Sequence, residues 1–419
     1  MLKENFLLDS FCERGNDLTK FSELIDEIWS KTKFIKMSSK DLSVLSVANE
    51  SDPEKIFVYL LNPREPLPGN SYTDKLRSYC RSLEKKKILE KGDFNSLIKE
   101  VEEDTRVLLY DDIRLLYVSS GIFSDLCQFG IKGDFIQKPS FARDMVIAQQ
   151  FKSDKKITLV CKSINGINKV FAIRSGKYSC IPQSILLDIA DKIKSAGLGD
   201  FVCKEWEVTN FLTQVYLEFP QKAEEMKIYY DLPDDYVPGL LLTTSDTGDC
   251  SVTVNGTWRI GNSITLQNRV AKQHMGKIDV DEIVKNAEST IFAEYTKLPK
   301  ALCNLMIQNI TDASWDLSTV AGRKANTEAI EDTIKSAFKQ LDMIKLIGKK
   351  NEKSLYTQLV DEFDPEMSFT AYDVAKSIMG IPGRLKGLNA VVERNLRRAV
   401  GQAPYLDYSA DPATIVLTA

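Results

Sequence analysis

The sequence predicts an α+β protein in which a central, mostly antiparallel β-sheet is flanked by helical regions at both ends. Three observations lead to this fold class. Period-two and β-branched runs lie between residues 155 and 260, helical periodicity dominates elsewhere, and short glycine-containing turns separate the runs. With 43% apolar and 27% charged residues the composition is that of a folded globular protein. A chain of 419 residues exceeds one ordinary core, so two to three domains are expected.

We expect three parts: a helical N-terminal region over residues 1–150, an α+β basic sheet domain over 151–278 and a helical C-terminal region over 279–419. In the first part a helix begins near Thr19, where apolar residues recur at helical spacing. Further helix-like stretches cover 83–98 and 101–117, after a proline-rich loop at 62–70.

The middle part reads in the order β-β-β-α-β-β-β-β. Its helix spans 183–196, begins after Pro182 and ends at Gly197. A short second helix is expected at 220–227. The expected strands are 156–161, 169–174, 178–181, 201–209, 211–219, 240–244 and 251–260.

The last part is helical. Asp279 or Asp281 caps a helix that we expect Pro299 to end. The helices that follow are expected at about 300–310, 323–347 and 352–363, and then as a pair that begins near Thr370 and is interrupted at 380–383.

Two long stretches of the sheet domain contain no acidic residue, although Asp and Glu number 59 in the chain. They span Lys155–Leu187 and Cys250–Ile278 and carry ten positive charges. If their strands share one face, that face is basic on a protein of net charge −4, which favours an anionic partner such as a nucleic acid. The alternative is a solvated sheet whose counter-charges come from distant segments.

Within these stretches, cationic, aromatic and amide side chains are interleaved, as suits phosphate contact and base stacking. His274 lies near two lysines, which favours its neutral form. The alternative for these segments is a hairpin tip and a loop with local hydrogen bonds. The candidate nucleic-acid-binding residues are Arg174, Lys177, Tyr178, Trp258, Arg259, Arg269, Lys272, His274 and Lys277.

The densest polar cluster of the chain is the turn that contains Ser245, Asp246 and Asp249. It is a candidate for binding a cation, a phosphate or a ribose. A tight turn with side-chain-to-backbone hydrogen bonds is the alternative. Its acids match no calcium-loop spacing, and one Asp-Thr-Gly triplet cannot form the aspartate pair of an aspartic protease.

A basic stripe is expected near the C-terminus. Arg394, Arg397 and Arg398 fall at i, i+3 and i+4, on one face of a helix. The stripe is suited to binding phosphates or an acidic surface of a neighbouring subunit. Its alternative role is the favourable interaction of cations with the end of a helix dipole.

Several classes of site are excluded or not indicated. The chain has one histidine and eight dispersed cysteines without a Cys-x-x-Cys pair, so no metal site and no cofactor are expected. No phosphate-binding loop or dinucleotide fingerprint is present, and we expect no enzymatic activity. No apolar stretch is long enough for a membrane helix and the first residues lack a signal-peptide core, so a cytoplasmic protein that does not contact membranes is expected.

Residues 169–295 resemble a phage/plasmid-like protein family of unknown function. The resemblance rests on Arg174 and Tyr178 at a strand end, on the turn at 244–251, and on Arg259–Ile264 followed by His274. The turn lacks the family's histidine, and Gly261 replaces its cysteine. The resemblance implies a mobile-element origin and a role in viral DNA metabolism or host takeover, without an established chemistry. The strand and helix order at 155–196 is also similar to the core of phage single-strand annealing proteins.

The function expected from these observations is non-catalytic binding of single-stranded DNA in replication or recombination, by an annealing-type protein that forms homo-oligomers in the host cytoplasm. One alternative is a protein-interaction module that acts on a host factor. A small hydrolase that uses Ser245, Asp246 and Asp249 is a further alternative.

Overall fold

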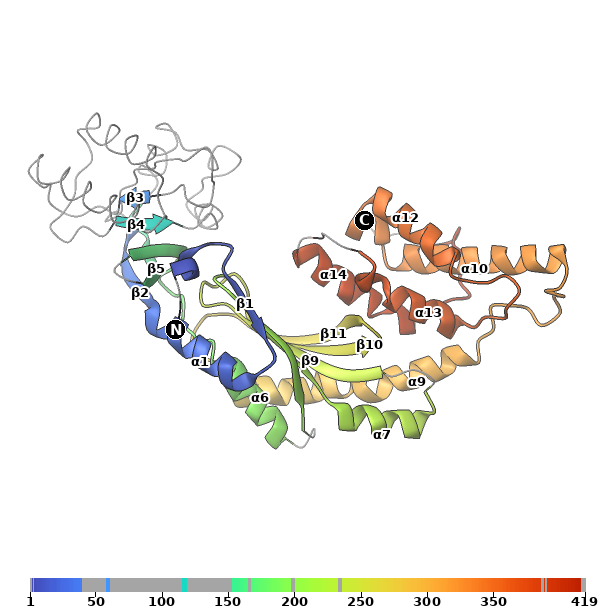
Figure 1. The fold of residues 1–419 in the computed structure, drawn as a ribbon, viewed down its shortest axis with the longest axis horizontal. Coiled ribbons are helices and arrows are strands. Elements are labelled where there is room, and N and C mark those ends of the chain that lie inside the picture. The colour runs from blue at the N-terminus through green and yellow to red at the C-terminus, as the bar shows by residue number, and fades with distance from the viewer. Residues whose placement is uncertain are drawn as a thin grey trace, which may run out of the picture.

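The computed structural model describes residues 2, 4–39, 58–60, 115–118 and 153–415, the last range with gaps at 165–166, 197–199, 233–235, 386–387 and 389. The predicted loop at 62–70 and helix at 83–98 lie outside the described residues. The α+β class is confirmed, because two sheets and a set of helices make up the described chain (Figure 1).

The larger sheet has six strands in the order β1-β7-β8-β9-β10-β11, and every neighbouring pair in it is antiparallel. The predicted antiparallel sheet is therefore present, but the strands predicted at 156–161 and 169–174 lie in a second, smaller sheet, so the two stretches without acids do not share one sheet face. The strands of the larger sheet are β1 (Cys12–Gly15), β7 (Val202–Thr209), β8 (Thr213–Glu218), β9 (Tyr236–Thr244), β10 (Val252–Ile260) and β11 (Ser263–Lys272).

The smaller sheet has five described strands in the order β2-β5-β6-β4-β3. Its only parallel pair among these strands is β4 with β6. The strands are β2 (Thr32–Ser38), β3 (Val58–Leu60), β4 (Leu115–Val118), β5 (Lys156–Ile164) and β6 (Ile167–Ser175).

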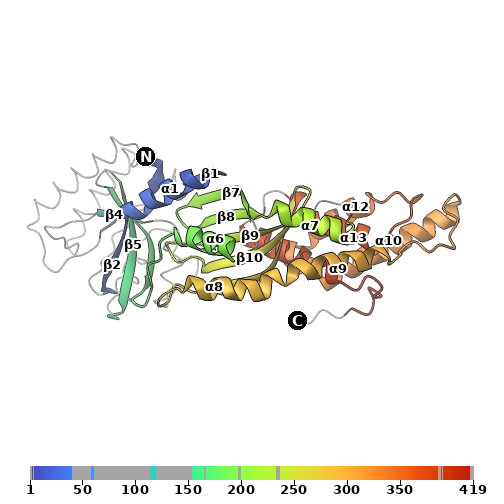
Figure 2. The same ribbon diagram turned by 90° about the horizontal axis from the view of Figure 1, so that it is seen from below.

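Helices cover one face of the large sheet, as Figure 2 shows. They are α6 (Ile185–Ser195), α7 (Pro220–Tyr230), α8 (Val280–Ala287), the π-helical turn at Glu288–Phe292 and α9 (Glu294–Met306). Alternate strand residues such as Leu217, Leu240 and Trp258 face them and are fully buried. Tyr295 closes this layer: its ring packs edge-on against Trp258 at 5.5 Å, and its hydroxyl donates to the Gly239 carbonyl.

The C-terminal helices form a lobe at the other end of the molecule from the small sheet (Figure 1). They are α10 (Val320–Gln340), α11 (Met343–Ile347), α12 (Lys349–Val360), α13 (Ala371–Met379) and α14 (Ala390–Val400). The predicted starts are confirmed by caps, since Asp279 accepts the Glu282 N–H and Thr370 forms a capping box with Asp373. Of the helices in the described ranges, none combines the length and apolar character needed to cross a membrane.

The described part of the N-terminal region is less helical than predicted. The expected helix at Thr19 is α1 (Leu18–Lys31), but it lies between two strands: β1 pairs with β7, and β2 pairs with β5. The end of the predicted helix at 101–117 falls in β4. These strands are short and their partners are distant in the sequence, so local periodicity carries little signal for them.

Three other element predictions are wrong. Residues 178–181 form a single bridge between Tyr178 and Met275 rather than a strand. No strand was predicted after Ile260, where a loop was the alternative interpretation, but the segment forms β11. Its polar residues give no strand pattern, and Gly261, at φ +56°, reverses the chain between β10 and β11. Pro299 lies inside α9, because the buried face around Leu298 and Leu302 outweighs one lost backbone hydrogen bond.

Candidate binding site on the open face of the large sheet

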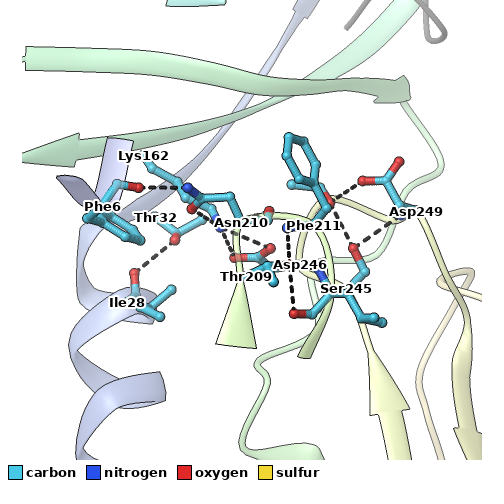
Figure 3. A network of polar contacts seen from close by, with 12 residues as sticks. Phe6, Ile28, Thr32, Lys162, Thr209, Asn210, Phe211, Ser245, Asp246 and Asp249 are labelled. Carbon is cyan, nitrogen blue, oxygen red and sulfur yellow. Dashed lines mark hydrogen bonds and ion pairs between the residues drawn. The ribbon is translucent and has the colours of Figure 1, made fainter. Parts of the chain in front are cut away.

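The polar turn between β9 and β10 is held by its own hydrogen bonds. The Ser245 hydroxyl lies 2.8 Å from the Thr247 hydroxyl, which donates to Asp249 Oδ2 at 2.5 Å. The Asp249 N–H donates to Ser245 Oγ at 3.2 Å (Figure 3), and Gly248 adopts φ +78°. The buried Ser245 therefore contacts a hydroxyl and an amide, neither of which is a base for nucleophilic catalysis.

Asp246 of this turn is paired with a buried lysine. Lys162, on β5, places Nζ 3.0 Å from Asp246 Oδ2 and 3.2 Å from both oxygens of Asn210 (Figure 3). The Lys162 and Asp246 side chains are 0% and 1% exposed. Nζ also lies over the rings of Phe6 and Phe171. Burial lowers the Lys162 pKa, while the Asp246 carboxylate opposes that shift. The pair is closed to an external ligand.

Three of the predicted nucleic-acid contacts gather around the same turn. Arg174 donates to the Thr247 carbonyl and to Asp249 Oδ1, the latter at 2.8 Å. Tyr178 donates to the Asp246 carbonyl and stacks on His274, with ring centroids 5.5 Å apart. Burial, helped by the nearby Arg174 charge, lowers the His274 pKa to about 4. Tyr178 and His274 are buried, so neither ring is presented to a nucleic acid.

Other predicted contacts are likewise occupied. Trp258 is in the core, fully buried beneath α9. Arg259 donates to both oxygens of Glu218, at 2.5 and 3.2 Å, and Lys272 lies 3.0 Å from Glu282. Glu218 comes from a distant segment, as the alternative interpretation of the acid-free stretches predicted, and Glu282 comes from the following helix α8. Lys177, Arg269 and Lys277 are exposed.

The face of the large sheet opposite its helices is partly covered by α14. Between them lies a cavity of about 390 Å³. The strands contribute polar and apolar side chains to its lining, and α14 contributes charged ones. We call this cavity the groove. Its lining includes Arg14, Glu205, Glu207, Gln214, Tyr216, Leu241, Leu266, Glu393, Arg394 and Arg397.

Two of the arginines in the groove are neutralised locally. Arg14 on β1 donates to Glu207 on β7, with Nε 2.6 Å from Oε2. Arg397 on α14 bonds Glu393 one turn earlier at 2.6 Å and donates to the Ile264 carbonyl at 3.4 Å. These bonds place α14 against β11 and leave Arg394 as the groove arginine without an ion pair to a described residue.

Arg394 belongs to a group of three neighbouring guanidinium groups. The other two are Arg398, one turn later on α14, and Arg269 on β11; we call the three the arginine group. Gln267 Nε2 donates to the Gly401 carbonyl at 3.0 Å, which brings the part of β11 that carries Arg269 to the end of α14. Burial lowers the pKa of Arg398, and the charges of Arg269 and Arg394 lower it further. No member forms an ion pair within the described chain, and Nη2 of Arg398 is buried without a hydrogen-bond partner.

The sequence singled out every member of this group and one further groove residue, Arg397. Arg269 was a predicted contact, and Arg394, Arg397 and Arg398 formed the predicted stripe. Glu205, Glu207 and Gln214 were missed. Their strands, β7 and β8, were predicted, yet which face of the sheet stays open depends on where the helices pack.

Comparison of the chain with protein-family models, curated proteins and solved structures finds no match. The resemblance to the phage/plasmid-like family therefore rests on the short motifs quoted above.

Proposed function

We propose that this chain is a non-catalytic protein that binds single-stranded DNA at the groove, through the arginine group. The supporting observation is the group itself: Arg394 and Arg398 lie one turn apart on α14, Arg269 lies on the adjacent β11, and none of the three forms an ion pair within the described chain. Neighbouring cations repel one another, and a buried guanidinium nitrogen without an acceptor loses hydrogen-bond energy. A bound phosphate would relieve both costs, because guanidinium groups bind phosphate oxygens bidentately.

The setting of the group favours a single strand over a duplex. Arg394 of the group lines the cavity between the large sheet and α14, together with the apolar side chains of Leu241 and Leu266. A flexible strand can enter such a space and lay a base against apolar side chains. A duplex is stiff over this length and presents its phosphates on a wide rod.

The proposal is tested by fluorescence anisotropy with a labelled oligonucleotide over a salt series. We expect the double variant Arg269→Gln/Arg398→Gln to lose at least tenfold in affinity and to reduce the salt slope by about 1.4, since each lost phosphate contact on a single strand contributes about 0.7. The matched control is Arg323→Gln on α10, which removes a partly exposed arginine that is paired with Glu366. Undetectable or salt-independent binding at low ionic strength would refute the proposal.

A protein-interaction role is the second candidate, and the groove's mixed charge favours it. Glu205 and Glu207 line the same groove as Arg394, and alternating charges suit a protein surface of complementary pattern. A pull-down from nuclease-treated host lysate separates the two functions. A partner that survives the nuclease and is lost on Arg394→Gln supports this candidate over DNA binding.

A further inference from the structure

The groove has opposite charges at its two ends. The arginine group lies at β11, whereas Glu205 and Glu207 lie on β7. The sheet order β7-β8-β9-β10-β11 separates these strands by four spacings, which is roughly 19 Å. Glu207 is bonded to Arg14, but Glu205 forms no ion pair within the described residues. A phosphate backbone that runs from β11 to β7 would thus meet two carboxylates, Glu205 and Glu207, beside the cation of Arg14.

The size of the cavity sets a second limit. A volume of about 390 Å³ is at the lower end of the range for sites that hold one small molecule. The cavity can take one nucleotide, but not a run of several. The carboxylates on β7 and the small volume of the cavity thus both indicate that a strand does not lie along the groove.

Resting on the function proposed above, we propose that the groove binds the end of a strand, with a terminal phosphate at the arginine group and the terminal nucleoside extending toward β8 and β7. A terminal phosphate carries up to two negative charges near neutral pH, because its second pKa is about 6, whereas an internal phosphodiester carries one. Three guanidinium groups therefore favour the terminal group. Toward β7, the oxygens of Gln214 and Glu205 can accept hydrogen bonds from base amino groups.

The test uses one labelled oligonucleotide in three forms: with a 5′ phosphate, with a 3′ phosphate, and with neither. We expect one phosphorylated form to bind roughly tenfold more tightly than the unphosphorylated form, as charge-assisted hydrogen bonds to one extra charge imply. The exposed Arg269→Gln and the half-buried Arg398→Gln should each reduce that preference, and Arg323→Gln should keep it. Because Arg269 is exposed, its variant can be read even if Arg398→Gln folds poorly.

Glu205→Gln probes the other end of the groove. Removing this carboxylate should strengthen binding of the unphosphorylated strand and so narrow the preference, because the repulsion of internal phosphates is removed. Deoxyadenosine monophosphate, whose base carries an amino group, is added as a competitor and distinguishes a strand end from a free nucleotide. If it binds as tightly as the phosphorylated oligonucleotide, the strand is not the ligand and the inference is wrong.

The outcomes separate this inference from the proposed function. If all three oligonucleotides bind equally and with salt dependence, the end-binding inference fails and the proposed function stands. If none of them binds at low ionic strength, the proposed function fails as well.

Discussion

At the scale of single residues, His274 shows how tertiary burial reverses the meaning of a sequence pattern. Among lysines and amides in the sequence, it was a candidate ligand for nucleic acid. In the structure its ring lies flat against Tyr178, with Nδ1 3.2 Å from the Tyr178 hydroxyl and Nε2 buried without a hydrogen-bond partner. Arg174 is the charged group that acts on it, and it opposes protonation. His274 is thus a neutral core residue.

This burial makes stability depend on pH. The His274 pKa is about 4 in the folded chain and about 6.5 in the unfolded one, so between these values the unfolded chain holds a proton that the folded chain lacks. The free energy of unfolding should therefore fall as the pH falls, with His274 contributing a loss of about 2 kcal/mol between pH 7 and pH 5.

Urea denaturation at both pH values checks this prediction by comparing wild type with His274→Gln. Carboxylates titrate in both proteins, so the difference between the two pH dependences belongs to His274. An equal pH dependence in the two proteins would show that the imidazole stays accessible to protons in the folded state.

At the scale of elements, the position of α14 defines the groove. The helix meets β11 at Gly401, where an added Cβ would lie 2.4 Å from the Leu266 carbonyl oxygen. Gln267 Nε2 donates to the Gly401 carbonyl at 3.0 Å, which holds this close approach. A glycine is required here by the distance between two backbones.

Gly401→Ala should therefore push α14 away from β11 while keeping every arginine. We expect a loss of about 1–3 kcal/mol in stability, as for other overpacked contacts, together with weaker binding of the oligonucleotide. Thermal denaturation and anisotropy measure the two effects. Asn395→Ala, on an exposed position of the same helix, is the control. Wild-type affinity in Gly401→Ala would mean that the position of α14 does not shape the binding site.

At the scale of the whole molecule, the Lys162–Asp246 pair joins the two sheets. Lys162 lies on β5 of the small sheet, and Asp246 lies in the turn after β9 of the large one. Asn210 bonds this lysine and donates to the carbonyls of Phe6 and Leu8, so the N-terminal segment closes over the junction (Figure 3). One buried ion pair thus connects the two sheets, and they do not fold around separate cores.

Removing one partner of this pair should destabilise both sheets together. Asp246→Asn leaves a buried cation without its counter-charge, which costs about 3–5 kcal/mol, and Lys162→Met/Asp246→Asn should cost less than the sum of the single changes. Guanidinium denaturation followed by tryptophan fluorescence measures this, since Trp29 packs on Phe34 of β2 and Trp206 lies in β7. Glu366→Gln, at an exposed pair, is the control and should change stability by less than about 1 kcal/mol. Two separate transitions would contradict the shared junction.

Much of the fold was predictable where elements carry local signals. The helix at Ile185–Ser195 follows Pro182, and α8 and α13 begin at the capping residues that the sequence indicated. The β7–β8 hairpin was also predicted. Failures fall where a strand's own periodicity is weak, as for β1, whose partner β7 is distant in the sequence, and for β11, a polar strand that pairs with the adjacent β10.

The candidate site was predictable in its ingredients. Arg269, Arg394 and Arg398 stand out as cations without a balancing acid nearby on their own helix face or strand. Neither segment by itself predicts that these side chains lie close together, since more than a hundred residues separate β11 from α14. The same holds for Glu205, which became part of the site because the helices pack on the other face of β7.

The sequence by itself determined the α+β class, the starts of several helices and the two stretches without acids. Only the tertiary structure decided which cations in them are neutralised: Lys162, Arg174, Arg259 and Lys272 meet Asp246, Asp249, Glu218 and Glu282. The reason is physical, because local propensity depends on neighbours in the chain, whereas charge compensation depends on neighbours in space. Among the described residues, Arg269 is one of the cations in these stretches that this compensation leaves without an ion pair, as are Lys177 and Lys277.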